Sequence, residues 1–339
     1  MPTLKQTLLW LVLGLMCFSC ENLFFEEEVE TADPFTNFDY LWQECDEKYA
    51  YFTLKNIDWL AVRERYRSQL HEGMSQDSLF NVMGAMLSEL RDDHTNLISP
   101  FNISSFGVRY LGQDNFDFRL IEDKYIGTDY YRSGPFIHDF LAQKQVGYIR
   151  FPAFSGAVDN FNLDFILNRY RDTQGLILDL RENGGGSPRD MFNILSRFID
   201  QETIVYYSRI KNGAGKDDFS EALPASLEPS TGIRYSPEKK VIVLTDLGTY
   251  SAGSFTALAT KALPNVILVG DTTGGGLGLP NGGQLPNGWL YRFSVSQALI
   301  LDLRPDYENG VPPDILAFID WNDRTKDEVL ERALEEILE

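Results

Sequence analysis

Short apolar segments alternate with amphipathic segments from residue 146 onwards, and this alternation restricts the fold more than any other feature. Apolar runs of strand length lie at 146–151, 175–180, 203–210, 241–244 and 266–269. Segments with helical spacing of apolar residues lie at 158–171, 189–199, 252–263 and 325–338. Strands that alternate with helices are typical of an α/β core. We therefore expect residues 145–339 to form such a core.

A helical pattern precedes this region. Within residues 35–98 apolar side chains recur every three or four positions, as in Leu79, Val82, Met83, Met86, Leu87 and Leu90. Ser75 is a suitable N-cap for this last helix, which should end near Arg91 and leave DDHT (92–95) in a turn. Residues 99–144, with scattered glycines, are expected to form a connector of short strands and turns. A chain of 339 residues with 43% hydrophobic content can hold one large core and a smaller accessory domain.

The first twenty residues have the pattern of an export signal. Lys5 is followed by an apolar run at 8–18 and then by Ser19 and Cys20. The run is short for a membrane span. A small residue directly before cysteine is similar to a bacterial lipobox, so residues 1–19 are expected to be a lipoprotein signal peptide and Cys20 the lipid attachment site. A plain secretory peptide is the alternative. The acid-rich residues 20–34 are expected to be a solvated tether that holds the domain off an envelope membrane.

Charge and cysteine content exclude several classes of function. A formal net charge of −20 opposes binding to nucleic acid or anionic lipid, which needs clustered Lys and Arg. Removal of Cys17 with the signal and acylation of Cys20 would leave Cys45 without a partner for an intrachain disulfide. Three scattered histidines and one thiol do not have metal-ligand spacing, so no metal site or cofactor is expected.

A glycine-rich segment, DLRENGGG (179–186), follows the strand expected at 175–180. Consecutive glycines let backbone amides approach a ligand closely and point at developing negative charge. The segment therefore suits an oxyanion hole. A phosphate-binding loop is the rival interpretation, but no Gly-Lys-Ser/Thr follows it.

Two further polar segments follow expected strands. TDLGTYSAGS (245–254) leads into a helix and places Ser251 at the helix start, where the dipole and nearby amides favour an alkoxide and an oxyanion. A simple N-cap role for Ser251 is the alternative. The esterase motif Gly-x-Ser-x-Gly is absent, because Thr249 occupies its first glycine position. YENGVPPD (307–314) offers Glu308 or Asp314 to orient a histidine.

Taken together and in this order, these segments resemble the C-terminal processing and tricorn-type serine peptidases. The similarity also includes LRDDHT (90–95) and VGDTTGGG (269–276). It implies a crotonase-like α/β core of repeated strand-strand-helix units, with an N-terminal helical domain and a C-terminal helix. It also implies that Ser251 is the nucleophile and that the amides of Ala252 and of Gly185 or Gly186 form the oxyanion hole.

The family activates its serine through lysine or through histidine. The lysine branch has its lysine where this chain has Gly276, and Lys261 is ten residues, about 15 Å, along the helix from Ser251. The tricorn-like branch has a histidine in the turn where this chain has His94, and its near-neutral pKa suits a general base. The resemblance offers Glu308 to orient His94, directly or through a bridging hydroxyl.

Some features depart from the family pattern or have simpler explanations. Relatives often have serine directly before the catalytic histidine, where this chain has Asp93. Many relatives also carry a PDZ module between the helical region and the core, for which residues 99–144 are too few. His71 is expected to cap a helix C-terminus, and His138 to be structural or exposed.

The resemblance implies a serine endopeptidase that cleaves peptides or unfolded proteins of the cell envelope through an acyl-enzyme, with no cofactor. Membrane contact would occur only through the lipid at Cys20. The rival is a catalytically silent lipoprotein that binds a peptide or apolar ligand, although both Ser251 and His94 are present. An acyl-CoA hydrolase or isomerase would need a cationic nucleotide site, which the acidic composition opposes. No pattern in the sequence sets the number of subunits.

Overall fold

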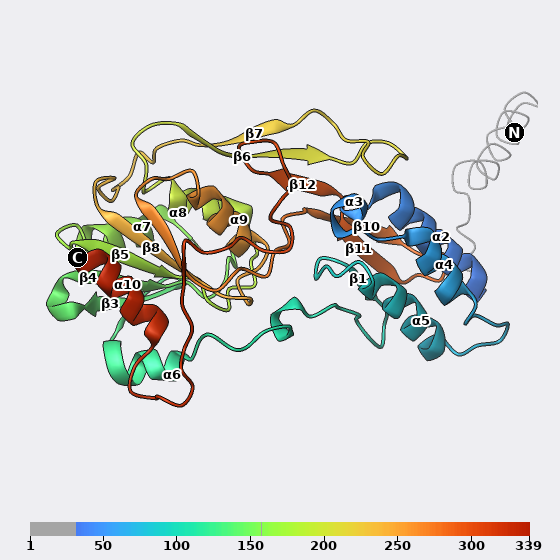
Figure 1. Cartoon of the computed structure of the whole chain (residues 1–339), viewed down its shortest axis with the longest axis horizontal. Coiled ribbons are helices and arrows are strands. Elements are labelled where there is room, and N and C mark those ends of the chain that lie inside the picture. The colour runs from blue at the N-terminus through green and yellow to red at the C-terminus, as the bar shows by residue number, and fades with distance from the viewer. Residues whose placement is uncertain (1–31, 157) are drawn as a thin grey trace, which may run out of the picture.

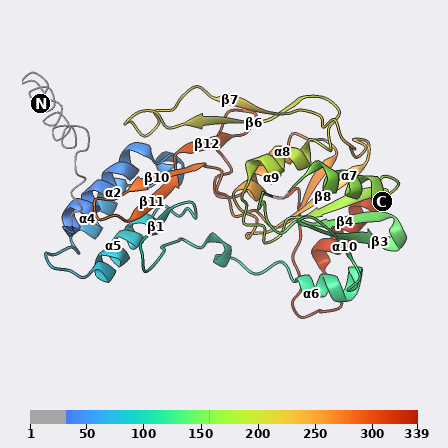
Figure 2. The ribbon, with the colours of Figure 1, turned by 180° about the vertical axis from the view of Figure 1, so that it is seen from behind.

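The computed structural model describes residues 32–156 and 158–339, which form two lobes (Figure 1). The signal peptide expected at 1–19, Cys20 and most of the expected tether lie outside the described residues. A small lobe contains the first helices and a short sheet, and a large lobe contains a seven-stranded sheet. The segment between β1 (Asn96–Ile98) and α6 (Phe118–Ile121) runs from one lobe to the other, as both views show (Figures 1 and 2).

The described elements follow the expected alternation. The other helices are α2 (Pro34–Lys48), α3 (Phe52–Lys55), α4 (Trp59–Arg67), α5 (Gln76–Ser88), α7 (Asn160–Arg169), α8 (Pro188–Leu195), α9 (Ala252–Thr260) and α10 (Glu328–Leu338). The other strands are β2 (Tyr131–Ser133), β3 (Phe136–Leu141), β4 (Val146–Arg150), β5 (Gly175–Asp179), β6 (Thr203–Ile210), β7 (Leu223–Leu227), β8 (Lys240–Thr245), β9 (Val266–Gly270), β10 (Pro280–Gln284), β11 (Leu290–Ser294), β12 (Ser296–Leu299) and β13 (Ile315–Leu316). Short 3-10 or π turns occur at Val108–Tyr110, Glu122–Ile126 and Ala142–Lys144.

The large sheet has the strand order β13-β9-β8-β5-β4-β3-β2. Its five strands from β13 to β4 are parallel, and β3 and β2 are added antiparallel at one edge. Every residue of β5 is buried, as expected of a parallel strand that is covered on both faces. The fold class predicted from the sequence, a mixed α/β protein with helices at both ends of the chain, is confirmed.

Successive residues of the central strands face two different cores. Leu176 and Leu178 of β5 pack in the core beneath α7, α8 and α9, whereas Ile177 packs in the core beneath α10. This alternation follows from the two-residue repeat of a strand. It places α9, and therefore the residue at its start, at the carboxyl end of β8 on one face of the sheet.

The small lobe is not purely helical. β1 and β10 both pair with β11 in a three-stranded antiparallel sheet. Tyr291 and Phe293 of β11, and Trp289 just before it, are buried in one cluster with residues of α2 and α5 such as Phe38 and Met83. Residues 280–294 were expected to belong to the large core, but their aromatic side chains complete the core of the small lobe instead.

Segment 99–144 also contributes to the large lobe. Its strands β2 and β3 extend the edge of the seven-stranded sheet beside β4. Among the described residues, no helix has both the length and the apolar composition that are required to cross a bilayer.

Candidate active site

Ser251 lies at a sharp turn between β8 and α9. Its backbone has φ 53° and ψ −121°, a conformation that costs a residue with a side chain about 1–3 kcal/mol. The turn is held because Tyr250 N donates to Asn183 O at 2.9 Å and Ser251 N donates to Gly275 O at 3.0 Å. The Ser251 side chain makes no capping hydrogen bond to α9, so the simple N-cap role is not observed.

His94 lies in the turn that follows α5, as expected from the sequence. Its backbone N donates to Asp92 Oδ1 at 2.8 Å, and Thr95 N donates to Asp92 O at 3.0 Å. The ring makes an edge contact with Tyr250, with ring centroids 5.0 Å apart. Burial lowers the pKa of His94 below its usual 6.5, and Asp92 opposes this shift. The imidazole is therefore neutral at neutral pH and can accept a proton.

The structure brings Ser251 and His94 together. His94 Nε2 lies 2.9 Å from Ser251 Oγ, a hydrogen-bond distance, although the residues belong to different lobes. The other ring nitrogen, Nδ1, carries the proton when Nε2 accepts from Ser251 Oγ; it is buried and makes no hydrogen bond of ordinary geometry to the described residues. A hydroxyl bonded to a neutral imidazole is the arrangement that activates a serine for nucleophilic attack.

The Asp93 carboxylate bonds to backbone amides of the next segment and not to the imidazole. Its carboxylate accepts hydrogen bonds from Gly107 N and from Val108 N, the latter at 2.9 Å. Asp93 therefore anchors the segment that crosses between the lobes.

Glu308 is buried close to the site but is not bonded to His94. Its Oε2 accepts from Leu277 N at 2.8 Å, and its Oε1 lies 3.3 Å from Lys55 Nζ. Burial raises the pKa of Glu308 to about 7, although Lys55 opposes this shift. Asp314, the other acid proposed to orient a histidine, pairs with Lys261 at 2.6 Å and accepts from Leu268 N. Lys261 and Asp314 therefore stabilise the edge of the large sheet.

The glycine run packs directly against Ser251. A Cβ at Gly185 would lie 2.6 Å from Tyr250 O and 2.7 Å from Ser251 Cβ, and Gly185 has φ 93°. Its amide donates to Asn183 Oδ1 at 2.9 Å, so this predicted oxyanion donor is bonded within the loop. Gly186 and Ala252 line the cleft beside Ser251. The amide of Ala252 lies in the first turn of α9, where helix N–H groups have no intrahelical acceptor.

The cleft that contains Ser251 and His94 has a volume of about 720 Å³. One wall is apolar and includes Pro188, Phe255 and Leu279. Arg109 and Arg292 bring positive charge to the same cleft. A cavity of this size accommodates several side chains of a peptide.

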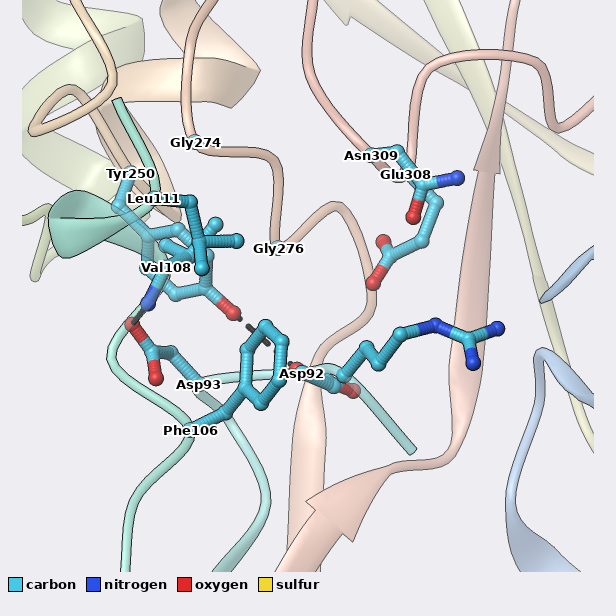
Figure 3. A pocket seen from close by; sticks show the side chains of 11 residues that line it. Asp92, Asp93, Phe106, Val108, Leu111, Tyr250, Gly274, Gly276, Glu308 and Asn309 are labelled. Atoms are coloured by element: carbon cyan, nitrogen blue, oxygen red, sulfur yellow. Dashed lines mark hydrogen bonds between the residues drawn. The ribbon is translucent and has the colours of Figure 1, made fainter. Parts of the chain in front are cut away.

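A second cavity, of about 280 Å³, adjoins the cleft (Figure 3). Asp93 and Tyr250 line both cavities, and Glu308 lines the second one. Figure 3 shows the Tyr250 hydroxyl directed at Asp92, to which it donates at 3.1 Å. Tyr250 therefore separates the two cavities and supports the turn that carries His94.

Part of the DLRENGGG segment is structural. Arg181 is fully buried and binds Asp179 at 2.7 Å and Asp327 at 2.8 Å. Asp327 also caps α10 by accepting from Leu330 N. This network joins β5 to the last helix beneath the glycine run.

The remaining histidines do not reach the site. His138 is buried between Ser133 Oγ at 2.9 Å and Tyr170 Oη at 2.8 Å, which confirms a structural role. His71 is exposed in the turn after α4, where Nδ1 contacts Glu72 O. Within residues 32–156 and 158–339, no three His, Cys, Asp or Glu side chains gather as a metal site.

Sequence reasoning did not identify Lys55, Asp92 as a partner of His94, or Tyr250 as a wall of the site. Asp92 lies two positions before His94 and Tyr250 directly precedes Ser251, so proximity in sequence could have indicated both residues. Lys55 has no such neighbour, because it ends the short helix α3 and reaches the site only through the tertiary fold.

Comparisons with known proteins identify the family of this chain. The sequence profile of peptidase family S41 matches residues 145–317, and that of the tricorn protease C1 domain matches residues 31–88. The carboxy-terminal processing protease CtpA of Bacillus subtilis (strain 168) is 26% identical over 182 residues, which are 53% of this chain and 37% of CtpA. The chain thus matches about a third of the length of such curated relatives.

Solved structures cover nearly the whole chain. A crystal structure of a protein from Parabacteroides merdae ATCC 43184 superimposes with a TM-score of 0.86 at 37% identity, covering 91% of this chain and 98% of that one. Mature CPAF superimposes with a TM-score of 0.66 at 14% identity, covering 90% of this chain and 96% of that chain, which shows a shared fold. Because the family profile matches half of its length and a relative at 37% identity covers 91% of it, the chain belongs to peptidase family S41.

Proposed function

We propose that this chain is a serine endopeptidase that hydrolyses peptide bonds through an acyl-enzyme. The observation that carries the proposal is the 2.9 Å contact between His94 Nε2 and Ser251 Oγ at the edge of a large cleft. Membership of peptidase family S41 supports the reaction class.

In the first step Ser251 Oγ attacks the carbonyl carbon of the substrate while its proton moves to His94 Nε2. The C–N bond then breaks, and the leaving amine takes that proton from His94. In the second step His94 removes a proton from water as the water oxygen attacks the carbonyl carbon of the ester. The C–Oγ bond then breaks, His94 returns the proton to Ser251 Oγ, and the acid is released. The lowered pKa of His94 suits this cycle, because the base must be neutral before attack.

Negative charge on the tetrahedral intermediate needs hydrogen-bond donors. We assign this role to the amide of Ala252 and to the glycine run at Gly186, both of which line the cleft. Such donors contribute on the order of 3–4 kcal/mol to an acyl transfer. The positive end of α9 acts on the same charge.

Peptide-library and casein digestion with wild type, Ser251→Ala and His94→Ala tests the proposal. We expect cleavage by wild type only, with the rate constants of both variants lower by on the order of 10⁴ or more. His138→Gln is a matched control, because it removes a buried histidine remote from the cleft. Equal digestion by all variants would contradict the mechanism, and peptide binding without digestion would favour a silent binding protein.

We also propose that Cys20 carries a lipid that anchors the protein to the bacterial cell envelope. The support is the sequence pattern alone, an apolar run followed by Ser19 and Cys20. Metabolic labelling with a fatty acid should label wild type and Cys17→Ser but not Cys20→Ser. Labelling of Cys20→Ser would contradict the proposal.

A further inference from the structure

Lys55 and Glu308 form a buried ion pair beside the site that the reaction steps above do not use. Their Nζ and Oε1 atoms are 3.3 Å apart, and the side chains are 2% and 1% exposed. Removing two charges from water costs several kcal/mol per ion, and apolar residues of similar volume are often as stable or more stable. Stability alone therefore gives little reason for a lysine here.

Lys55 holds the turn that carries His94. Its Nζ donates to Leu90 O at 3.2 Å and to Arg91 O at 2.9 Å. In return the Arg91 guanidinium donates to Lys55 O at 2.5 Å. These bonds fix the chain three and four residues before His94, at the point where Arg91 takes up a positive φ of 49°.

Glu308 holds the turn that supports Ser251. Its carboxylate accepts from Leu277 N at 2.8 Å, and its carbonyl accepts from Gly276 N at 3.2 Å. The neighbouring Gly275 O accepts the Ser251 amide at 3.0 Å. Movement of Glu308 would therefore be transmitted to the backbone of the nucleophile.

The charge of Lys55 also compensates a second buried acid. Burial would raise the pKa of Asp92, but the nearby Lys55 charge, together with His94 and the hydrogen bonds from Ser294 and His94 N, makes the net shift downward. An ionised Asp92 is the form that accepts hydrogen bonds from both His94 N and the Tyr250 hydroxyl. The titratable groups around this region include Lys55, Asp92, Asp93, His94, Arg292, Glu308 and the hydroxyls of Tyr49, Tyr51 and Tyr250.

We propose that Lys55 is a positioning residue that ties the small lobe to the large lobe and so sets the distance between His94 Nε2 and Ser251 Oγ. On the small lobe Lys55 bonds to the turn before His94. On the large lobe it pairs with Glu308, which holds the glycine turn behind Ser251. The inference rests on the proposed function, because it concerns the geometry of the same pair.

The test compares three variants with wild type. Lys55→Met removes the charge and the hydrogen bonds but keeps most of the volume. The double variant Lys55→Met with Glu308→Gln also removes the carboxylate left unpaired, so that it folds even if the single variant does not. Lys261→Met is the matched control, because it breaks the Lys261–Asp314 pair away from the site.

The measurements are kcat and KM for a peptide substrate and the second-order rate of inactivation by a fluorophosphonate. Displacement of a reacting group by about 1 Å can lower a rate about 100-fold. We therefore expect both Lys55 variants to lose about 30-fold or more in kcat and in inactivation rate, with KM changed less than about threefold. Lys261→Met should stay within about twofold of wild type.

The outcomes separate this inference from the proposed function. If wild type is inactivated through Ser251 and the double variant has the same kcat and inactivation rate, Lys55 is not a positioning residue, but the serine mechanism stands. If wild type is not modified at Ser251, the proposed function itself fails. A loss confined to KM would also overturn the positioning role.

Discussion

His94 Nε2 and Ser251 Oγ are 2.9 Å apart although 157 residues separate them in the sequence and each belongs to a different lobe. The histidine follows α5 of the small lobe, and the serine begins α9 of the large lobe. Packing of the two lobes therefore decides whether the site is assembled. Any change that shifts one lobe against the other should affect the reaction more than it affects folding.

The strained backbone of Ser251 should lower the stability of the folded protein at the position that activity requires. Glycine tolerates φ 53° without a Cβ clash, whereas alanine keeps the strain. Ser251→Gly should therefore unfold in urea with a free energy about 1 kcal/mol greater than Ser251→Ala, and both should be inactive. Equal stability of the two variants would show that the turn is not strained.

Arg292 helps to lower the pKa of the general base, His94. It lines the cleft, donates from Nε to Asn96 Oδ1 at 2.6 Å, and its positive charge adds to burial in lowering the pKa of His94. Arg292→Gln should raise that pKa, so the acidic limb of kcat/KM should move to higher pH. Arg109→Gln is the matched cleft control and should leave the limb in place. A shift of the Arg292→Gln limb to lower pH would contradict this account.

His138 should make folding sensitive to acid. Burial lowers its pKa to about 4 from about 6.5, so the folded protein binds this proton less readily than the unfolded chain does. The stabilising contribution is complete above pH 6.5 and is lost as the pH falls toward 4. Thermal unfolding from pH 8 to 4 should therefore show a smaller decrease in Tm for His138→Gln than for wild type. Parallel profiles would contradict the prediction.

Loss of Arg181 should destabilise the large lobe. Arg181→Met would leave Asp327 buried without its cation and Asp179 with only the more distant Arg150 at 3.8 Å, a change that costs about 3–5 kcal/mol. Urea unfolding measures this difference. Arg332→Met, which breaks a more exposed helical pair with Glu336, should cost less than about 0.5 kcal/mol. Similar losses in both variants would show that the buried network contributes little.

Hydrophobic periodicity was sufficient to predict the α/β class, because it is a local property of the sequence. The pairing of His94 with Ser251 was predicted from the resemblance of several short motifs to a serine peptidase family, since no local pattern shows that two distant residues meet. Strands β10 and β11 were missed, since Pro280, Gly282 and Gly283 interrupt any alternating pattern, and the hairpin is stabilised by aromatic contacts with distant helices. The bond from Gly185 N to Asn183 Oδ1 likewise depends on loop geometry that no spacing encodes.

Lys55 and Glu308 illustrate the same limit for the site. Glu308 was identified through its motif, and His94 was expected to be its partner. The structure instead pairs Glu308 with Lys55, which lies 253 positions earlier in the chain. A lysine at the end of a four-residue helix has the local signals of an exposed residue. Only the packing of the lobes buries it.

The central claim is that His94 activates Ser251 for nucleophilic attack. The most direct measurement is mass spectrometry of wild type, His94→Ala and Ser251→Ala after reaction with a fluorophosphonate, with the modified residue identified by peptide mapping. The account predicts one adduct on Ser251 in wild type, formation at least about 100-fold slower in His94→Ala, and none at that position in Ser251→Ala. Equal rates in wild type and His94→Ala, or an adduct on another residue in wild type, would contradict it.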